Sequence, residues 1–523
     1  MSVPPGVTPK DFSDAIKRWQ EALGAEWVFT SDEDIDLYRD PYSPVWHEQE
    51  EPIASAAVAP DGVEQIQAVV RIANQYKIPL WTISTGKNLG YGGSAPLLGG
   101  SVVLDLKRMN RVLEVNDKNH YALVEPGVSY FDLYRYIQDH KLKVWIDPPD
   151  PGWGSPMGNS LERGGGYTPM HDHFDAVCGM EVVLPNGELM RTGMGALPGA
   201  KTWQQYKYGF GPYIQGAFSQ SSLGIVTKMG VWLYPEPEAY LLGTVMVWKR
   251  NDVIPLVEIF TELVSSGTMR GCTTVASPLW LGLPDPELDT LRAGGSVTAM
   301  EEYGRRKGIP YWSIPLPFYG PAKVVAAQWE YAKKKCSSIP GVTFQDGPSY
   351  RFPLNADELA KVRDPVQIGI PSLQIFGLLP PRSRGHIGFS PIVPMDGQAL
   401  IDAFSLFDSI HRELGWGRAV LTTLTSFPRA IVIIDLFPVE KDVEKNRKMR
   451  ELYRRLIKEA AARGWGEYRT HTTFMGDISN TYSFNNHALR RFHETVKDAV
   501  DPNGILSPGK CGIWPKRMRK AEA

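Results

Sequence analysis

Two glycine-rich stretches have the spacing that could hold a phosphate-bearing ligand. The first, STGKNLGYGGS at residues 84–94, follows an apolar run at 78–83, and the second runs from 152 to 169 with GWGS and RGGGYTP. Closely spaced glycines expose backbone N–H groups that suit a pyrophosphate, although tight-turn packing is the alternative for either stretch alone. No GxGxxG spacing occurs among the 50 glycines, which argues against the usual Rossmann and P-loop sites.

Several side chains could act on a bound molecule, and each has a structural alternative. His386, in RGHIGFS, could be a nucleophile, although a lone histidine is usually structural. Asp150, in DPPDPG, could be a base or a turn residue among prolines. Tyr468 and Arg469 could bind an anion or form a surface pair after a helix, and Tyr91 could join them or be a turn aromatic. Residue types alone leave these alternatives open.

A metal site is not expected. His171 and His173 form an HxH pair, but no Cys or acidic partner stands at ligand spacing. The four cysteines have no CxxC spacing and no haem-attachment motif, so a disulfide framework is not expected either. Sparse cysteine favours a reducing compartment, and we expect a cytoplasmic protein.

Length and charge narrow the class of protein. The chain has 523 residues, well past the roughly 250–300 at which one hydrophobic core stops growing, so we expect at least two domains. Lys and Arg number 56 against 58 Asp and Glu, which gives no general field for nucleic acid or an anionic membrane. No stretch approaches the roughly 20 apolar residues that span a bilayer. We therefore expect neither nucleic acid nor a membrane as partner.

The elements around the first glycine-rich stretch predict a β-α-β start. A helix is expected at 9–23, and an apolar run at 54–59 has the character of a strand stopped by Pro60. Asp61 could then cap a helix whose apolar face has helical spacing at Ile66, Val69, Val70 and Ala73. Strands are expected at 78–83 and 101–106, so the glycine-rich stretch begins where a strand ends.

The rest of the chain predicts a second domain and a return to the first. A hairpin is expected at 180–192, turning at Asn186-Gly187, and a strand at 224–233. From about 235 to 464 longer helical patterns and isolated strands such as 430–436 dominate, and Gly464 is placed to end the last helix. We expect a first domain at 1–235, a second at 236–464, and a segment at 465–523 that returns to the first.

Long motifs then make a family resemblance specific. They closely resemble the vanillyl-alcohol oxidase family of 4-phenol oxidases, in the same order, from about residue 54 to 514: STGKNLGYGG, EPGVSYFDLY, PGWGSPMGNSLERGGGYTP, DHFDAVCGMEVVLPNGELMRTGMGALPG, YGFGPYIQGAFSQSSLGIVTKMG, GHIGFSP, GWGEYRTH and DPNGILSPGKCGIWP. The resemblance implies an α+β fold. It consists of a two-part FAD-binding domain of the p-cresol methylhydroxylase (PCMH) type, made of two α/β subdomains, interrupted by a mixed α/β cap domain with an antiparallel sheet.

The resemblance also implies a role for each residue. His386 would be linked covalently to FAD, and Tyr91, Tyr468 and Arg469 would bind a phenolate. Asp150 would stabilise the benzylic carbon and assist water addition. Tyr91, Asp150, Tyr468 and Arg469 would thus be catalytic, and together with Tyr167 they would contact the substrate. The remaining FAD-binding positions would be Ser84, Thr85, Gly86, Lys87, Asn88, Gly90, Pro149, Gly154, Ser155, Gly158, Asn159, Gly166, Tyr167, Gly224, Ile225, Val226, Arg469 and Lys510.

The implied reaction is oxidation of a para-substituted phenol at its benzylic carbon. A 4-alkylphenol, 4-allylphenol or 4-hydroxybenzyl alcohol would lose a hydride to FAD and pass through a p-quinone methide. Hydration or desaturation would follow, with O2 reduced to H2O2. The alternatives are a methylhydroxylase-type dehydrogenase that passes electrons to a cytochrome c, and a ligand-binding module without catalysis. Histidine at 386, where the methylhydroxylase branch has tyrosine, favours an oxidase. Relatives suggest a homodimer or a larger homo-oligomer.

The chain departs from the family pattern at positions that would shape the pocket. Pro151 replaces a leucine beside Asp150, and Pro428-Arg429-Ala430 stands where relatives have a histidine pair. The stretch 369–386 is one residue shorter, lacks the acidic residues of relatives and contains Gln374. The para substituent and methoxy pattern that the enzyme prefers are therefore left open.

Overall fold

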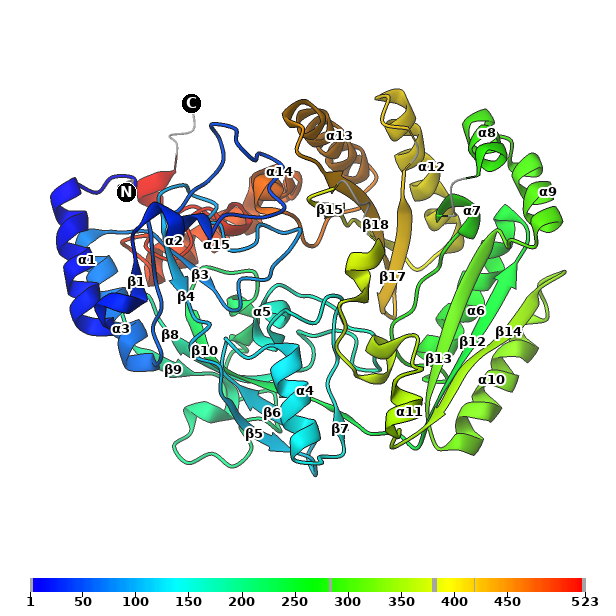
Figure 1. Ribbon diagram of the computed structural model, residues 1–523, viewed down its shortest axis with the longest axis horizontal. Coiled ribbons are helices and arrows are strands. Elements are labelled where there is room, and N and C mark those ends of the chain that lie inside the picture. The colour runs from blue at the N-terminus through cyan, green and yellow to red at the C-terminus, as the bar shows by residue number, and fades with distance from the viewer. Residues whose placement is uncertain (1–2, 282–284, 379–382, 418, 520–523) are drawn as a thin grey trace.

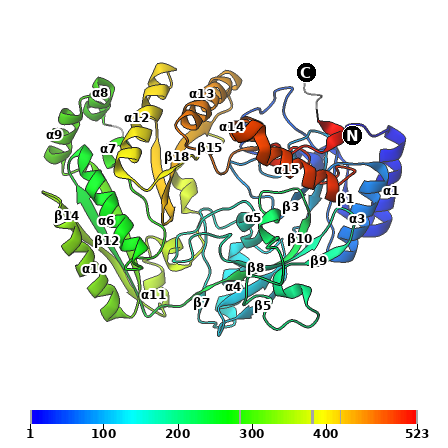
Figure 2. The ribbon, with the colours of Figure 1, turned by 180° about the vertical axis from the view of Figure 1, so that it is seen from behind.

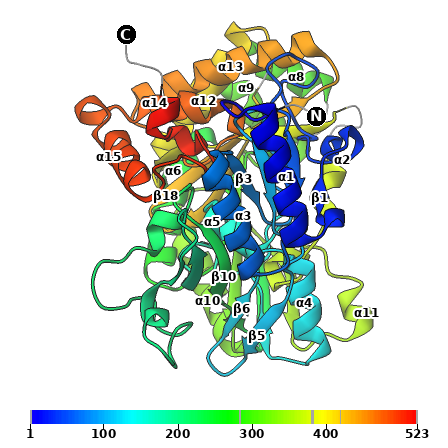
Figure 3. The ribbon, with the colours of Figure 1, turned by 90° about the vertical axis from the view of Figure 1, so that its left-hand side faces the viewer.

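The N-terminal elements form a small α/β layer. The computed structural model describes residues 3–281, 285–378, 383–417 and 419–519. The first sheet has the order β1-β2-β4-β3, in which β2, β4 and β3 are parallel, as the β-α-β pattern predicts. Helices α1 and α3 lie side by side against it (Figure 3). Their bounds are α1 (Pro9–Leu23), α3 (Val63–Tyr76), β1 (Val28–Phe29), β2 (Ala56–Val58), β3 (Leu80–Ile83) and β4 (Val102–Asp105).

Helix α3 confirms its predicted apolar face but not its predicted cap. Ile66, Val69, Val70 and Ala73 are fully buried. The N-cap position is occupied by Gly62 rather than Asp61, and no side chain caps the helix. The Asp61 carboxylate instead accepts a hydrogen bond from Arg108. An ion pair with a distant residue has replaced the local cap, which the sequence pattern could not reveal.

A second layer is built on a five-stranded antiparallel sheet with the order β5-β6-β10-β8-β9. The hairpin between β8 and β9 turns at the predicted Asn186-Gly187, where Gly187 has a φ of +86°. Helix α4 begins with a capping box between Ser129 and Asp132. The bounds are β5 (Val112–Asn116), β6 (Tyr121–Val124), β8 (Val177–Val183), β9 (Leu189–Arg191), β10 (Ile225–Trp232), α4 (Tyr130–Asp139) and α5 (Pro156–Leu161).

The middle of the chain forms a separate body with two antiparallel sheets, where one was expected. Helices α6 and α10 lie over one face of the three-stranded sheet β13-β12-β14 (Figure 2). The four-stranded sheet contains β15, β18, β16 and β17, with α12 packed beside β16. The bounds are β12 (Ala239–Val247), β13 (Trp312–Gly320), β14 (Thr343–Arg351), β15 (Gly385–Phe389), β16 (Ile392–Pro394), β17 (Leu421–Phe427), β18 (Ala430–Val439), α6 (Val253–Ser265), α10 (Ala322–Cys336), α12 (Gly397–Glu413) and α13 (Val443–Ala462).

The C-terminal segment lies among the N-terminal elements, as Figure 1 shows by the red ribbon beside the blue one. Leu506 pairs with Leu80 of β3 in a parallel bridge. The mixed helix and sheet architecture matches the predicted α+β class. In the described residues no helix has the length and apolar character needed to cross a membrane. The remaining bounds are α2 (Asp32–Asp36), α7 (Pro278–Leu281), α8 (Pro286–Gly294), α9 (Val297–Lys307), α11 (Ala356–Leu359), α14 (Met475–Thr481), α15 (Phe484–Val500), β7 (Val144–Trp145) and β11 (Tyr234–Pro235).

Candidate active site

A cavity of about 310 Å³ lies between the two N-terminal layers and the middle body. It is lined by both glycine-rich stretches, by the start of β10 and by residues of the C-terminal segment. Most residues expected at the site line it. The predicted residues among its walls are Ser84, Thr85, Gly86, Lys87, Asn88, Tyr91, Pro149, Asp150, Gly154, Ser155, Gly158, Asn159, Tyr167, Gly224, Ile225, Val226, Tyr468, Arg469 and Lys510.

The loop after β3 offers unpaired backbone donors. In the described part of the chain, the N–H groups of residues 85–90 have no acceptor. Gly86 has a φ of +69°, and a Cβ there would lie 2.4 Å from the Ser94 hydroxyl oxygen. A Cβ on Gly158 would lie 2.3 Å from Ser84 Oγ, so the two glycine-rich stretches touch at this point. Unpaired N–H groups at the wall of a cavity suit a pyrophosphate, which fits the expected FAD.

Tyr91, Tyr468 and Arg469 meet at one part of the cavity. The guanidinium carbon of Arg469 lies 3.9 Å from the centroid of the Tyr91 ring. Arg469 Nη2 donates to Asn88 Oδ1 at 2.8 Å, while its Nε is buried without a partner among the described residues. Burial and the neighbouring Tyr91 raise the pKa of Tyr468, and the positive charge of Arg469 opposes this. The Tyr468 hydroxyl therefore stays protonated near neutral pH and can donate to an anion.

Asp150 carries a partly buried carboxyl group without a cation beside it. Its Oδ1 has no hydrogen-bond partner in the described part of the chain. Burial raises the pKa of Asp150 to about 6. Tyr167 lies nearby, since burial and then the charge of Asp150 raise its pKa. A carboxyl group with a pKa near 6 can exchange a proton at neutral pH, as a general base must.

His386 lies on β15, just behind the first glycine-rich loop. A Cβ on Gly90 would lie 3.0 Å from the carbonyl oxygen of His386, so loop and strand are in contact. The imidazole packs beside Tyr42, with ring centroids 5.8 Å apart, and its Nδ1 is buried without a partner among the described residues. Burial lowers the pKa of His386, so the ring is neutral at pH 7. His386, Gly90 and Gly166 are not among the lining residues.

Lys510 and His173 have clear partners. Lys510 forms an ion pair with Glu162, and although burial alone would lower its pKa, Glu162 raises it above the usual value. His173 is buried, with Nε2 at 2.8 Å from the carbonyl oxygen of Asp147 and Nδ1 at 2.6 Å from Asn159 Oδ1. His173 thus joins the strand end that carries Asp150 to helix α5. Among the described residues no cluster of three or more potential ligands could hold a metal ion.

Several lining residues were not expected from the sequence. Gln220 donates to the carbonyl oxygen of Tyr468 at 2.8 Å and adopts a positive φ of 47°. Its motif, FSQSSLGIVTK, was recognised, but only the Gly224–Val226 part was assigned to the site. The four-stranded sheet of the middle body contributes apolar atoms through Leu424 and Ile434. Further unexpected lining residues are Phe218, Ser221, Ser222, Ser390, Thr472, Met475, Leu506 and Ser507.

Comparison with known proteins identifies the family. The FAD binding domain family matches residues 54–193, and the C-terminal domain of FAD linked oxidases matches residues 385–511. The chain is 34% identical to the 4-cresol dehydrogenase [hydroxylating] flavoprotein subunit of Pseudomonas putida, over 98% of this chain and 97% of that one.

Two solved structures are similar over nearly the whole chain. A 4-ethylphenol oxidase from Gulosibacter chungangensis, in an isoeugenol complex, has a TM-score of 0.86 and 35% identity over 99% of this chain and 100% of that one. A p-cresol methylhydroxylase with substrate bound has a TM-score of 0.85 and 32% identity over 98% and 99%. These matches confirm the expected PCMH-type fold and FAD as cofactor. The chain therefore belongs to the family of FAD-linked oxidoreductases that includes 4-cresol dehydrogenase and 4-ethylphenol oxidase.

Proposed function

We propose that the protein is a flavoprotein oxidase of para-substituted phenols, which removes a hydride from the benzylic carbon. One observation carries this proposal. Tyr91, Tyr468, Arg469 and Asp150 line the same cavity, where Arg469 stacks on Tyr91 and Asp150 Oδ1 has no partner among the described residues. Relatives named for 4-cresol and 4-ethylphenol support the substrate class. The substrates we propose are 4-alkylphenols, 4-allylphenols and 4-hydroxybenzyl alcohols.

The tyrosines and the arginine hold the phenol oxygen in its ionised form. Two phenol donors and a guanidinium favour the charged state of an oxygen that lies among them. The ionised oxygen pushes electron density through the ring toward the para carbon, which makes loss of a hydride from the benzylic position possible. FAD, when bound, supplies the acceptor for that hydride. The substrate then becomes a p-quinone methide.

Asp150 acts on the carbon at the other side of the ring. Its negative charge stabilises the electron-poor benzylic carbon, and it accepts a proton from the water that adds there. Addition of water gives an alcohol, and an alcohol substrate gives an aldehyde or a ketone. Loss of a second proton instead gives a vinylphenol. Tyr167, half-buried near Asp150, forms part of the wall against which the ring packs.

We also propose that FAD is attached covalently to His386. The imidazole is neutral, its Nδ1 is unpaired among the described residues, and the loop expected to hold the cofactor touches its strand. The residues that would hold FAD are the free N–H groups of 85–90, the Gly154–Asn159 stretch, the start of β10 and Lys510. Acid precipitation tests the link: flavin should stay in the pellet of the wild type and appear in the supernatant of His386→Ala.

A pair of substrates tests the phenolate requirement. Mixed anaerobically with the protein, 4-ethylphenol should bleach the flavin absorbance within seconds. The ether 4-ethylanisole has the same ethyl group but no ionisable oxygen, and it should leave the colour unchanged. Product mass and peroxide release identify the reaction. Failure of every para-substituted phenol to bleach the flavin, or equal bleaching by the ether, contradicts the proposal.

A dehydrogenase is the second candidate, because the 34% identical relative is a 4-cresol dehydrogenase. The histidine at 386 and the 4-ethylphenol oxidase structure favour transfer of electrons to O2, with H2O2 as product. The reduced protein mixed with air-saturated buffer separates the two candidates. An oxidase regains its yellow colour within seconds, whereas reoxidation over minutes would favour a cytochrome partner.

The remaining proposals concern organisation. We propose a FAD-binding domain at 1–235, a cap at 236–464 and a returning segment at 465–523, since the largest hydrophobic cluster of the described residues lies between 239 and 460 except for Phe474. A homodimer or a larger homo-oligomer and a cytoplasmic location stay predictions. Size-exclusion chromatography with light scattering tests the oligomeric state.

A further inference from the structure

A buried ion pair stands where the C-terminal segment meets the cavity. Lys497 lies near the end of α15 and Asp501 just beyond it, and both side chains are fully buried. Lys497 Nζ lies 2.6 Å from Asp501 Oδ2. Neither residue lines the cavity, and neither has a part in the reaction proposed above.

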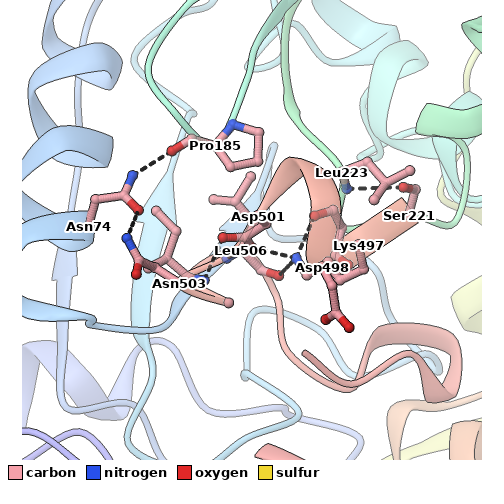
Figure 4. Close-up of polar contacts among 12 residues, drawn as sticks. Asn74, Pro185, Ser221, Leu223, Lys497, Asp498, Asp501, Asn503 and Leu506 are labelled. Carbon is pink, nitrogen blue, oxygen red and sulfur yellow. Dashed lines mark hydrogen bonds and ion pairs between the residues drawn. The ribbon is translucent and has the colours of Figure 1, made fainter. Parts of the chain in front are cut away.

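The ammonium group uses all three of its donors. Besides Asp501, Lys497 donates to the carbonyl oxygens of Ser222 and Leu506, each at 2.7 Å. Asp501 in turn accepts the N–H groups of Ile505 at 3.0 Å and Leu506 at 2.9 Å. Figure 4 shows Lys497, Asp501 and Leu506 pointing toward one another. The pair is therefore saturated by directional bonds to the backbone, and its geometry is tightly specified.

The two carbonyl groups belong to parts of the cavity wall that come from different layers. Ser222 and Leu506 both line it. Ser222 lies just before β10 of the antiparallel sheet. The segment around Leu506 bonds to Leu80 of β3, which accepts from Ser507 at 2.7 Å and belongs to the parallel sheet. One ammonium group thus joins two parts of the cavity wall, one next to the antiparallel sheet and one bonded to the parallel sheet.

A second connection runs parallel to the first. Asn503 donates to Asn74 Oδ1 at 2.9 Å, and Asn74 donates to the carbonyl oxygen of Pro185 (Figure 4). Asn74 lies on α3 beside the parallel sheet, and Pro185 lies in the β8–β9 turn of the antiparallel sheet. The segment 497–507 therefore bonds to both layers at Lys497 and Leu506, and at Asn503 it bonds to Asn74, which itself links the two layers.

Net stability is a poor explanation for such a pair. Desolvation of two charges offsets most of their attraction, and well-packed apolar residues often stabilise a fold as well or better. A saturated ion pair instead fixes direction and distance, which apolar contacts do not. The walls it joins hold FAD, so their separation sets the fit of the cofactor.

We propose that Lys497 and Asp501 are positioning residues for FAD, which hold the Ser222 and Leu506 walls of the cavity at the separation that the cofactor requires. The inference depends on FAD binding alone and not on the substrate or on the electron acceptor. A loosened pair is expected to widen the site and to lower its occupancy, and to change the environment of the bound ring. The expression host must supply FAD in excess for the comparison.

Two variants and one control test the proposal. Lys497→Met keeps the side-chain length but leaves the Asp501 charge buried and unpaired; Lys497→Met with Asp501→Asn removes that charge as well. Arg292→Met removes another buried cation, which donates to the carbonyl oxygen of Leu279 at 2.6 Å and to Asp289 at 2.9 Å. Arg292 lies on α8, in the cap far from the FAD-binding layers (Figure 1). The measurements are FAD per chain, visible circular dichroism of the bound flavin, and unfolding temperature.

Both Lys497 variants should lose about half or more of their FAD and show an altered visible circular dichroism spectrum. The double variant should unfold at a higher temperature than Lys497→Met, because no unpaired charge remains, and below the wild type because it has lost FAD. Arg292→Met should keep a normal flavin spectrum even where its unfolding temperature falls. A double variant with wild-type FAD content and spectrum, or the same spectral change in Arg292→Met, would overturn the proposal. Because no phenol is used, failure here is distinct from failure of the proposed reaction.

Discussion

The residues proposed to meet the two ends of the substrate contain acidic groups in opposite electrostatic settings. At the donor end, our name for the residues proposed to bind the phenol oxygen, Tyr91 and Tyr468 lie with Arg469, whose guanidinium stacks on the Tyr91 ring. At the carboxylate end, our name for the residue proposed to act on the benzylic carbon, Asp150 has neither an ion-pair partner nor a partner for its Oδ1 among the described residues. Burial raises the pKa of both Tyr468 and Asp150, but only at the donor end does a positive charge oppose the shift.

In the proposed reaction this difference would favour an anion at the donor end and a proton acceptor at the carboxylate end. Desolvation penalises charge at both, so we expect the anion beside the guanidinium of Arg469. A ring held between the ends would have its ionised oxygen at Arg469 and its para carbon toward Asp150. Each variant below changes one end only, and so tests whether binding of the phenol oxygen and reaction at the benzylic carbon can be altered separately.

The largest effect is expected from Asp150→Asn, which removes the acceptor and its charge but keeps the shape. Flavin reduction by 4-ethylphenol should slow by about a hundredfold or more, the usual scale for a positioned base or charge. Stopped-flow absorbance measures the rate. Binding of 4-tert-butylphenol, which has no benzylic hydrogen, should be nearly unchanged because the donor end is intact. Equal losses of rate and of binding would mean that the two ends do not act separately.

Arg469→Met should give the opposite pattern. Loss of the guanidinium weakens a charge-assisted hydrogen bond by about 1.5–3 kcal/mol, which corresponds to about 10–150-fold in binding of 4-tert-butylphenol. The reduction rate should fall as well, since less of the bound phenol is ionised. Arg463→Met, at the exposed end of α13, is the matched control and should behave as the wild type. Unchanged binding of 4-tert-butylphenol to Arg469→Met would refute the proposed role of Arg469 in binding the phenol oxygen.

Tyr468→Phe should have a smaller effect, because the cation and Tyr91 stay in place. Loss of one hydrogen bond to an anion predicts about tenfold weaker binding and slower reduction. Tyr482→Phe is the control: its hydroxyl donates to the backbone of Glu467 at 3.0 Å and does not line the cavity. If both tyrosine variants lose the same amount, the effect comes from packing and the role of Tyr468 is refuted.

Local patterns explain most of what could be predicted from the sequence. The apolar spacing of α3, the Asn186-Gly187 turn and the glycine-rich loop after β3 depend on neighbours within a few residues, and all appear as expected. Most of the residues that the family motifs predict for the site line one cavity. The roles of those residues stay predictions. Gly90, Gly166 and His386 lie outside the lining.

Contacts between distant parts of the chain could not be predicted in this way. Lys497 donates to a residue 275 positions away, and nothing local to an (i, i+4) Lys–Asp pair on a helix distinguishes it from a solvated one. The prediction that Asp61 caps α3 was wrong for the same reason, because Asp61 binds the distant residue Arg108 instead. The division of the cap into two sheets likewise depends on strand pairing across the domain, which alternation within each strand does not specify.

The smallest expected effect concerns stability and tests the carboxylate end without any substrate. Burial raises the folded-state pKa of Asp150 to about 6, from an ordinary value of 3.8. Below about pH 4 the carboxyl group is protonated in the folded and in the unfolded protein, so it does not make the free energy of unfolding depend on pH. Between these values folding takes up a proton, and above about pH 6 the buried carboxylate destabilises the folded state. Asn at this position is neutral at every pH.

Asp150→Asn should therefore unfold at the wild-type temperature near pH 4 and about 1–3 °C higher at pH 8. Differential scanning fluorimetry across this range measures the difference, with Asp139→Asn, an exposed change on α4, as the control that should show no such rise. A higher unfolding temperature of Asp150→Asn at pH 8 would show that the charge of Asp150 destabilises the folded protein. The donor end, in contrast, is proposed to stabilise a negative charge. A constant difference from pH 4 to pH 8 would mean that Asp150 is solvated like an ordinary carboxylate, and the contrast between the two ends would then depend on Arg469 alone.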